Sequence, residues 1–200
     1  MPMISSLPNL LTLSRIFVIP ALIGTFFFVE GAAGNWLSLG LFAAAGITDF
    51  LDGYLARQWG IQTRLGRFLD PVADKLLVVA VILLLIAFDR IDGFWTVLAA
   101  IVIVCREILV SGLREFLAEI RVGMPVSALA KWKTTVQILA LGFLLAGEAG
   151  DALLPSTTIG TWGLWIAAAL TLYTGYDYLR AGLDHMRHED DGGGGESGSP

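Results

Sequence analysis

The sequence predicts an all-α integral membrane protein with six transmembrane helices, and three observations support this fold class. Of its 200 residues, 56% are hydrophobic and 16% are charged, whereas soluble domains carry about 25% charged residues. The mean hydropathy is +0.72. The chain also contains six apolar stretches of about 20 residues, the length that an α-helix needs to cross about 30 Å of hydrocarbon.

Each predicted helix is an apolar stretch that ends at a polar or turn-rich segment. The first is longer than the apolar core of a secretory signal, follows no basic segment and precedes no clear cleavage site, so we expect a retained helix. The other five follow in order, separated from one another by short polar segments. The stretches cover residues 10–29, 36–57, 69–88, 94–118, 126–147 and 160–182.

The charge distribution excludes several protein classes and indicates an orientation. A net charge of −5 argues against a nucleic-acid binder, the apolar composition excludes a disordered chain, and the single cysteine, Cys105, can form no intrachain disulfide. With the N-terminus inside, every Lys and Arg except Arg90 falls on the cytoplasmic side. This asymmetry predicts a multi-pass protein of the cell (inner) membrane with both termini facing the cytoplasm.

The last residues of the chain differ from the rest in composition. After Arg187 the sequence is acidic and rich in Gly and Ser, which predicts a disordered tail at 188–200 after a single membrane domain at 1–187. This tail and the predicted outer turns hold half of the 18 carboxylates. Because those carboxylates are expected to be exposed to water, their presence requires no functional explanation.

Four other carboxylates lie where the second and third stretches approach the cytoplasmic side. Asp49 and Asp52 are three residues apart, and Asp70 and Asp74 are four apart, so each pair shares one face of its helix. The short segment between the two stretches makes the helices antiparallel neighbours. The two pairs can therefore face each other.

An ionised carboxylate near hydrocarbon costs about 2.5–3.5 kcal/mol, so four together need compensation. Two divalent cations would supply it, because hard oxygen ligands from two helices suit Mg²⁺ or Mn²⁺, and such a pair of ions clamps a phosphoryl group during in-line displacement. Small residues beside the acids, Gly53, Ala56 and Gly66, leave room for a bulky ligand, and Arg57 offers a fork for phosphate oxygens. Alternatively, the acids pair with neighbouring Arg and Lys residues while the small residues serve helix packing.

The complete pattern resembles the signature of the CDP-alcohol phosphotransferases, membrane enzymes that build phospholipids from CDP-activated donors. The matching residues are Asp49-x2-Asp52-Gly53-x2-Ala56-Arg57-x8-Gly66-x3-Asp70-x3-Asp74. The resemblance implies six transmembrane helices with an amphipathic N-terminal segment, and a homodimer. It also implies that the four aspartates bind two Mg²⁺ or Mn²⁺ ions, that Asp74 is in addition the candidate base, and that Gly53, Ala56, Arg57 and Gly66 hold the CDP moiety.

Three further segments resemble the branch of this family that transfers a phosphatidyl group from CDP-diacylglycerol to glycerol 3-phosphate. They are 8–15, 106–115 and 131–135. The acceptor is a phosphate dianion that needs cations, and the candidates are Arg106, Arg114, Lys131 and Lys133. The resemblance favours the first three over Lys133. The same four residues could instead anchor the protein at the membrane surface or pair with Glu107, Glu115 and Glu119.

Other functions are compatible with parts of the pattern. Within the same family, the acceptor could be serine, inositol phosphate or phosphatidylglycerol. A divalent-metal transporter would also place carboxylates inside a helical bundle, but its polar residues should extend along a path through the membrane, whereas here they gather at one end. A lipid-binding scaffold would not need four metal-ligating carboxylates.

Overall fold

The computed structural model describes residues 7–59, 64–119 and 128–192, and within them the side chains of 12–51, 69–117 and 132–176. Six α-helices form these ranges, as the apolar stretches predict, and the all-α class is confirmed. The helices are α1 (Leu7–Phe28), α2 (Gly31–Trp59), α3 (Arg64–Ala87), α4 (Phe94–Glu119), α5 (Ala128–Asp151) and α6 (Ser156–Gly192).

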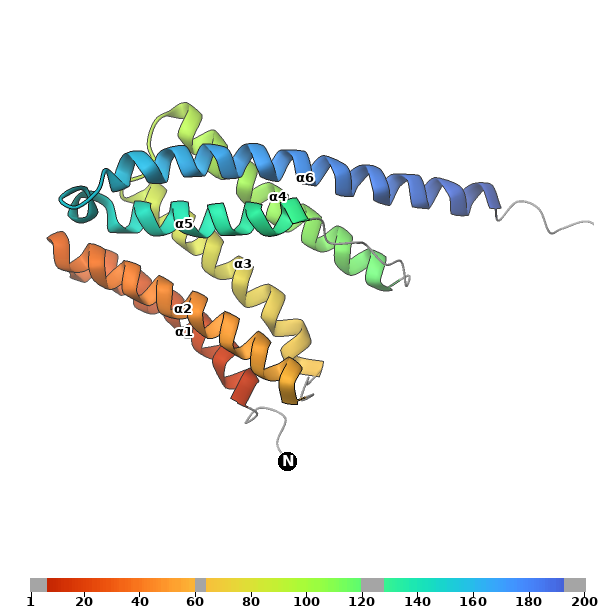
Figure 1. The fold of residues 1–200 in the computed structure, drawn as a ribbon, viewed down its shortest axis with the longest axis horizontal. Helices are drawn as coiled ribbons and strands as arrows, with labels where there is room; N and C mark the ends of the chain where they lie inside the picture. The colour runs from red at the N-terminus through yellow and green to blue at the C-terminus, as the bar shows by residue number, and fades with distance from the viewer. Residues whose placement is uncertain (1–6, 60–63, 120–127, 193–200) are drawn as a thin grey trace, which may run out of the picture.

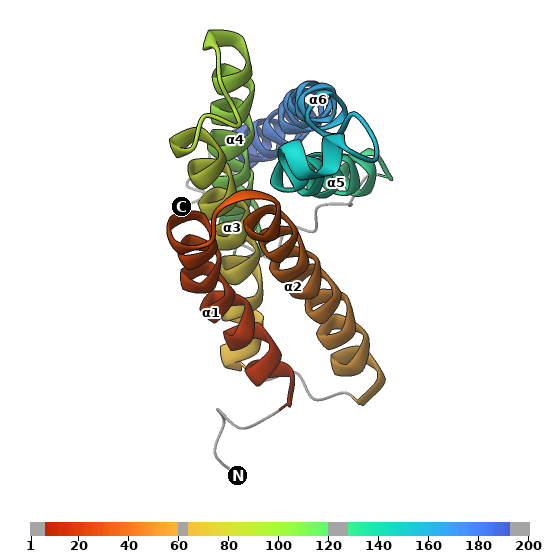
Figure 2. The same ribbon diagram turned by 90° about the vertical axis from the view of Figure 1, so that its left-hand side faces the viewer.

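The helices run up and down in sequence order and form two groups. The prediction that the second and third helices are direct neighbours is wrong for the described residues: α2 and α3 do not contact each other, and α1 packs against both. Helix α1 packs against α2 and α3, whereas α6 packs against α5 and α4, and α2 contacts α5 between the groups. Figure 1 shows the α1–α2, α3–α4 and α5–α6 turns at its left-hand side, which we call the turn end; Figure 2 views the molecule from this side. The opposite end of the helices, which we call the site end, carries the aspartates of the signature.

Helix α6 is the longest element and projects beyond the other helices in Figure 1. It continues to Gly192, so the first five residues of the predicted tail, 188–192, are helical. Residues such as Met186, Arg187 and Glu189 favour a helix. Residues 193–200 lie outside the described part of the chain, and the boundary at 187 stays a prediction.

Two glycines let α5 and α6 pack closely. A Cβ atom at Gly163 would lie 2.8 Å from Cβ of Ala140, and one at Gly160 would lie 2.7 Å from Cγ of Leu144. Both distances are shorter than carbon atoms tolerate, so only glycine allows this spacing. Such small-residue contacts are typical of helices that associate in lipid, where dispersion and close backbone approach replace the hydrophobic effect.

Large apolar side chains are exposed on all six helices. Phe17 on α1, Leu83 on α3 and Ile101 on α4 are 72%, 59% and 49% exposed. Exposed apolar surface of this extent is not stable in water and indicates a lipid environment. By length and hydropathy, one helix of the described residues qualifies as a membrane span, Phe94–Leu117, and Thr12–Phe28 is a shorter apolar helix.

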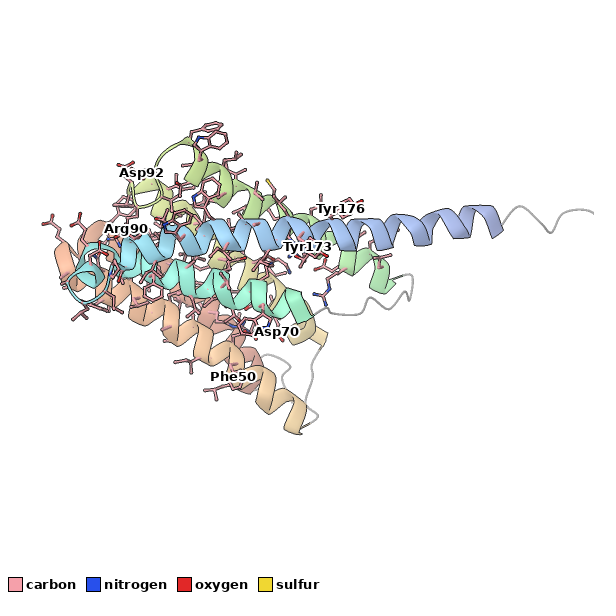
Figure 3. All side chains as sticks on the ribbon, turned by 45° about the horizontal axis from the view of Figure 1, so that its top comes forward. Phe50, Asp70, Arg90, Asp92, Tyr173 and Tyr176 are labelled. Carbon is pink, nitrogen blue, oxygen red and sulfur yellow. The ribbon has the colours of Figure 1, made fainter. Side chains whose placement is uncertain are left out.

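Arg90 ties the turn end together. Its Nη1 donates to the carbonyl of Leu145 at 2.9 Å, its Nη2 donates to Oδ1 of Asn35, and its Cζ lies 4.9 Å from the ring centre of Phe26. Helix α5 is interrupted just after Leu145, because Gly147 adopts φ 48° and ψ −139°. Arg90 therefore holds α1, α2 and the kink of α5 to the α3–α4 turn (Figure 3).

We expect Arg90→Met to lower the stability of the protein markedly. The change leaves the Leu145 carbonyl and the buried Asn35 amide without these hydrogen bonds, at a cost of about 2–4 kcal/mol. Thermal unfolding in detergent should show a Tm lower by about 5–10 °C. Asp92→Asn, at an exposed position of the same turn, is the matched control, and equal Tm values for both variants would contradict this role.

Candidate active site

A buried arginine lies among three aspartates at the site end. Arg15 of α1 is 1% exposed; its Nη1 contacts Oδ1 of Asp49 on α2 and Oδ1 of Asp74 on α3, and its Nη2 lies 3.6 Å from Oδ1 of Asp70. Thr12, one turn earlier on α1, donates to the same oxygen of Asp70 at 2.5 Å. We call Arg15 and the three aspartates the aspartate cluster; Figure 3 shows Asp70 well away from Arg90 and the turn end.

The helix packing explains why this cluster forms. Asp70 and Asp74 share one face of α3 through their spacing of four residues, and α1 packs against both α2 and α3. A side chain of α1 can therefore reach carboxylates of both neighbours. The aspartate side chains are 46–49% exposed, whereas Arg15 is buried behind them, so the carboxylates form the accessible surface.

The aspartate cluster has the chemistry of a divalent-cation site. Carboxylate oxygens are the ligands that Mg²⁺ and Mn²⁺ prefer, and three carboxylates against one guanidinium leave a negative balance. Among the side chains that the structure describes, however, no three acidic, histidine or cysteine residues lie close enough together to hold a metal ion. The carboxylates converge on Arg15 instead. The chemistry of these ligands suits a divalent cation, while in this structure Arg15 is the counter-charge that they surround.

A second charged group lies on α4 and α5. Lys133 is 2% exposed and its Nζ pairs with Oε1 of Glu107. Arg106 lies 3.8 Å from the same oxygen and donates to Oγ1 of Thr174 on α6 at 3.0 Å. A Cβ at Gly175 would come within 3.2 Å of the Arg106 side chain. Arg106 and Lys133 are thus fixed charges held between α4, α5 and α6.

A groove of about 940 Å³ connects the aspartate cluster to the turn end. At the site end its wall contains charged side chains, among them Asp49, Asp74 and Arg114. Along α2 it extends from Asp49 to Trp36, which corresponds to about 20 Å of helix. Most of this length is apolar, with α2 on one side and α5 on the other. We call it the α2–α5 groove.

The structure separates the predicted site residues into three sets. It gathers Asp49, Asp70 and Asp74 around Arg15, and it places Arg114 in the wall of the α2–α5 groove. Arg106 and Lys133 do not line the groove; Glu107, which pairs with both, does. The remaining predicted residues lie where the structure does not describe side chains: Asp52, Gly53, Ala56, Arg57, Gly66 and Lys131.

Three residues of this region carried no predicted function. Thr12 and Arg15 belong to a segment that the resemblance covers, and an arginine in an apolar stretch was the available signal. Gln137 is a polar side chain within the fifth apolar stretch, and the structure places it in the wall of the α2–α5 groove. The spacing of residues along the helix did not show whether Gln137 faces a groove or packs against another helix.

Comparison with known proteins adds independent information. Residues 5–173 match the family model described as CDP-alcohol phosphatidyltransferase. A Rickettsia felis protein named "CDP-diacylglycerol--glycerol-3-phosphate 3-phosphatidyltransferase" is 46% identical over 176 residues, which cover 88% of this chain and 94% of the relative. A Haemophilus influenzae protein of the same name is 40% identical over 177 residues, covering 88% and 92% of the two chains.

A plant protein with a different name is also similar. A "Cardiolipin synthase (CMP-forming)" from Oryza sativa is 40% identical over 194 residues, covering 90% of this chain and 58% of the relative. The similarity therefore extends to relatives whose names refer to different products. In each case it covers most of this chain.

Proposed function

The chain belongs to the CDP-alcohol phosphatidyltransferase family, and on this basis we propose that it transfers a phosphatidyl group from CDP-diacylglycerol to glycerol 3-phosphate. The products are phosphatidylglycerophosphate and CMP. Relatives named for this reaction, at 36–46% identity over about nine-tenths of the chain, support the acceptor. The rice relative makes phosphatidylglycerol the second candidate acceptor.

The α2–α5 groove is the observation that carries this proposal. It is about 20 Å long and joins a charged end, where Asp49, Asp74 and Arg114 lie, to a channel that is mostly apolar. One leaflet of hydrocarbon is about 15 Å thick, so the channel can take acyl chains over the depth of a leaflet. A ligand that fills both parts has a diphosphate head and a lipid tail, as CDP-diacylglycerol does.

The family uses divalent metal ions, and the residues proposed to hold two of them are Asp49, Asp52, Asp70 and Asp74. Bound Mg²⁺ or Mn²⁺ supplies positive charge that neutralises the diphosphate. Asp74 lies in the groove wall, where its carboxylate can accept the proton of the attacking glycerol hydroxyl. That oxygen attacks the phosphorus that bears diacylglycerol, and the bond to CMP breaks in line with it.

The other predicted site residues bind different parts of the two substrates in this proposal. Gly53, Ala56, Arg57 and Gly66 hold the CDP moiety, as the signature implies. Arg114, exposed in the groove wall, contacts the acceptor phosphate directly. Lys131 is assigned to the same phosphate. Arg106 and Lys133 act from behind Glu107, where their charges favour an anion in the groove.

We also propose that the enzyme is a homodimer in the cell (inner) membrane, with both termini and the active site on the cytoplasmic side. The positive charges at the site end support this orientation. In a Cys105→Ser variant, single cysteines introduced at Asp92 and at Glu115 are labelled from either side of sealed vesicles to test it. Labelling of both from the same side contradicts the orientation. Cross-linking in native membranes tests the dimer.

Release of CMP by the purified protein tests the reaction. The protein is incubated with CDP-diacylglycerol and Mg²⁺ or Mn²⁺, and glycerol 3-phosphate, serine, inositol phosphate or phosphatidylglycerol is added in turn. We expect CMP with glycerol 3-phosphate and little with the others. No CMP with any acceptor would contradict transfer from CDP-diacylglycerol, and CMP with phosphatidylglycerol alone would favour the second candidate.

A glycine in the groove wall provides a test of where the lipid binds. Gly46 on α2 lines the groove, and a Cβ there would meet no atom within 4 Å. We expect Gly46→Phe to lower kcat/KM for long-chain CDP-diacylglycerol by about tenfold, because the ring occupies space needed by an acyl chain. Gly40, on the same helix with equally open space, does not line the groove.

Gly40→Phe is therefore the matched control and should leave the rate unchanged. A short-chain CDP-diacylglycerol should be affected less by Gly46→Phe than the long-chain substrate. If both glycine variants act alike on both substrates, the groove does not hold the lipid.

A further inference from the structure

Gln137 is a buried polar side chain in the wall of the α2–α5 groove. It is 2% exposed, and its Oε1 has no hydrogen-bond partner among the described residues. An acceptor left without a partner in an apolar interior costs about 1–3 kcal/mol. Such a group in a groove wall indicates a ligand that donates a hydrogen bond to it.

The residues around Gln137 indicate which part of a ligand it could contact. Thr134 lies three residues earlier on α5 and also lines the groove, together with Glu107 and Arg114 of α4. Glu107 and Arg114 belong to the charged end, where the acceptor phosphate is proposed to bind. Gln137 lies about one helical turn further along α5 than Thr134, so a small acceptor whose phosphate is bound at the charged end can extend its carbon chain toward Gln137.

We propose that Gln137 determines acceptor specificity by accepting a hydrogen bond from the C2 hydroxyl of glycerol 3-phosphate. This inference rests on the proposed function. The C1 hydroxyl reacts and the phosphate is bound by cations, so the C2 hydroxyl is the remaining donor of the acceptor. The ester groups of the lipid donor only accept hydrogen bonds and cannot satisfy Oε1. The terminal torsion of glutamine is soft, so its amide can turn toward the groove.

The test compares two acceptors that differ only in this hydroxyl. Glycerol 3-phosphate has it, and 3-hydroxypropyl phosphate lacks it. We expect the native protein to prefer glycerol 3-phosphate by about tenfold in kcat/KM. Gln137→Met, similar in shape but without the amide, should abolish this preference through a higher KM for glycerol 3-phosphate, with KM for CDP-diacylglycerol unchanged.

A second buried residue provides the matched control. Thr171 on α6 is fully buried, its Oγ1 also lacks a hydrogen-bond partner among the described residues, and it does not line the groove. Thr171→Val and Gln137→Met should both maintain or raise the Tm of the substrate-free protein, because each removes a buried polar group without a partner. Only Gln137→Met should change acceptor preference.

Several outcomes would overturn this role. Recognition of the C2 hydroxyl by Gln137 would be excluded if Gln137→Met kept the native acceptor preference, with kcat/KM unchanged or lowered equally for the two acceptors. A higher KM of this variant for CDP-diacylglycerol would exclude it as well. A lower Tm for Gln137→Met would show a packing role instead. If the native protein releases no CMP with glycerol 3-phosphate, the proposed function is wrong. If the native protein does release CMP and the Gln137→Met variant shows the same acceptor preference as the native protein, only the proposed role of Gln137 is wrong.

Discussion

Asp74→Asn should lower kcat for CMP release with glycerol 3-phosphate by about 10³-fold, within the range expected for loss of a general base. The amide cannot take the proton of the attacking hydroxyl. It also has one fewer anionic oxygen for a divalent cation, so two causes must be separated. Measuring kcat at increasing Mn²⁺ concentration separates them, since a defect of cation binding alone is overcome by excess cation.

The control for Asp74→Asn is a carboxylate at the same end that takes no part in the cluster. Glu115 on α4 is exposed and does not line the groove. The hydrogen bond that it accepts from Ser111 is long, at 3.4 Å, and therefore weak. Glu115→Gln should retain native kcat. Full recovery of the Asp74→Asn variant at high Mn²⁺ would assign Asp74 to cation binding alone, and native turnover at low Mn²⁺ would exclude both roles.

The helices were predictable from the sequence because the membrane imposes their length. Hydrocarbon thickness fixes an apolar stretch of about 20 residues, and all six stretches correspond to helices. Their ends were less predictable. Helix α2 begins at Gly31 rather than at residue 36, and α6 covers Ser156–Gly192 rather than 160–182, because small and polar residues continue each helix beyond its large apolar side chains.

The candidate site was predictable only along single helices. The spacing of Asp70 and Asp74 determines that they share a face of α3, but no spacing indicates which residue of α1 lies opposite. Arg15 therefore became evident only in the structure. For the same reason, the sequence could not show that Lys133 lies behind Glu107 and away from the groove. Contacts between helices depend on rotation and crossing angle, which periodicity leaves open.

Removal of Arg15 should produce the largest loss of stability in this region. Arg15→Met leaves the carboxylates of Asp49, Asp70 and Asp74 close together without their common cation. Removing one partner of a buried ion pair costs about 3–5 kcal/mol. Because the aspartates are 46–49% exposed, solvent screens part of their repulsion, and we expect about 3 kcal/mol. Thermal unfolding in detergent with EDTA should therefore show a clearly lower Tm.

The response to Mn²⁺ distinguishes electrostatic compensation by Arg15 from simple packing. If the guanidinium balances the carboxylates in the metal-free protein, Mn²⁺ should raise the Tm of Arg15→Met more than that of the native protein, since a ligand stabilises the folded state more the more tightly it binds. Lys75→Met removes a neighbouring charge whose Nζ donates to the Pro71 carbonyl at 2.9 Å, and it should lower the Tm little. A large loss in Arg15→Met that Mn²⁺ does not reduce would mean that Arg15 stabilises this end by packing. In that case the aspartate cluster would not be held together by charge.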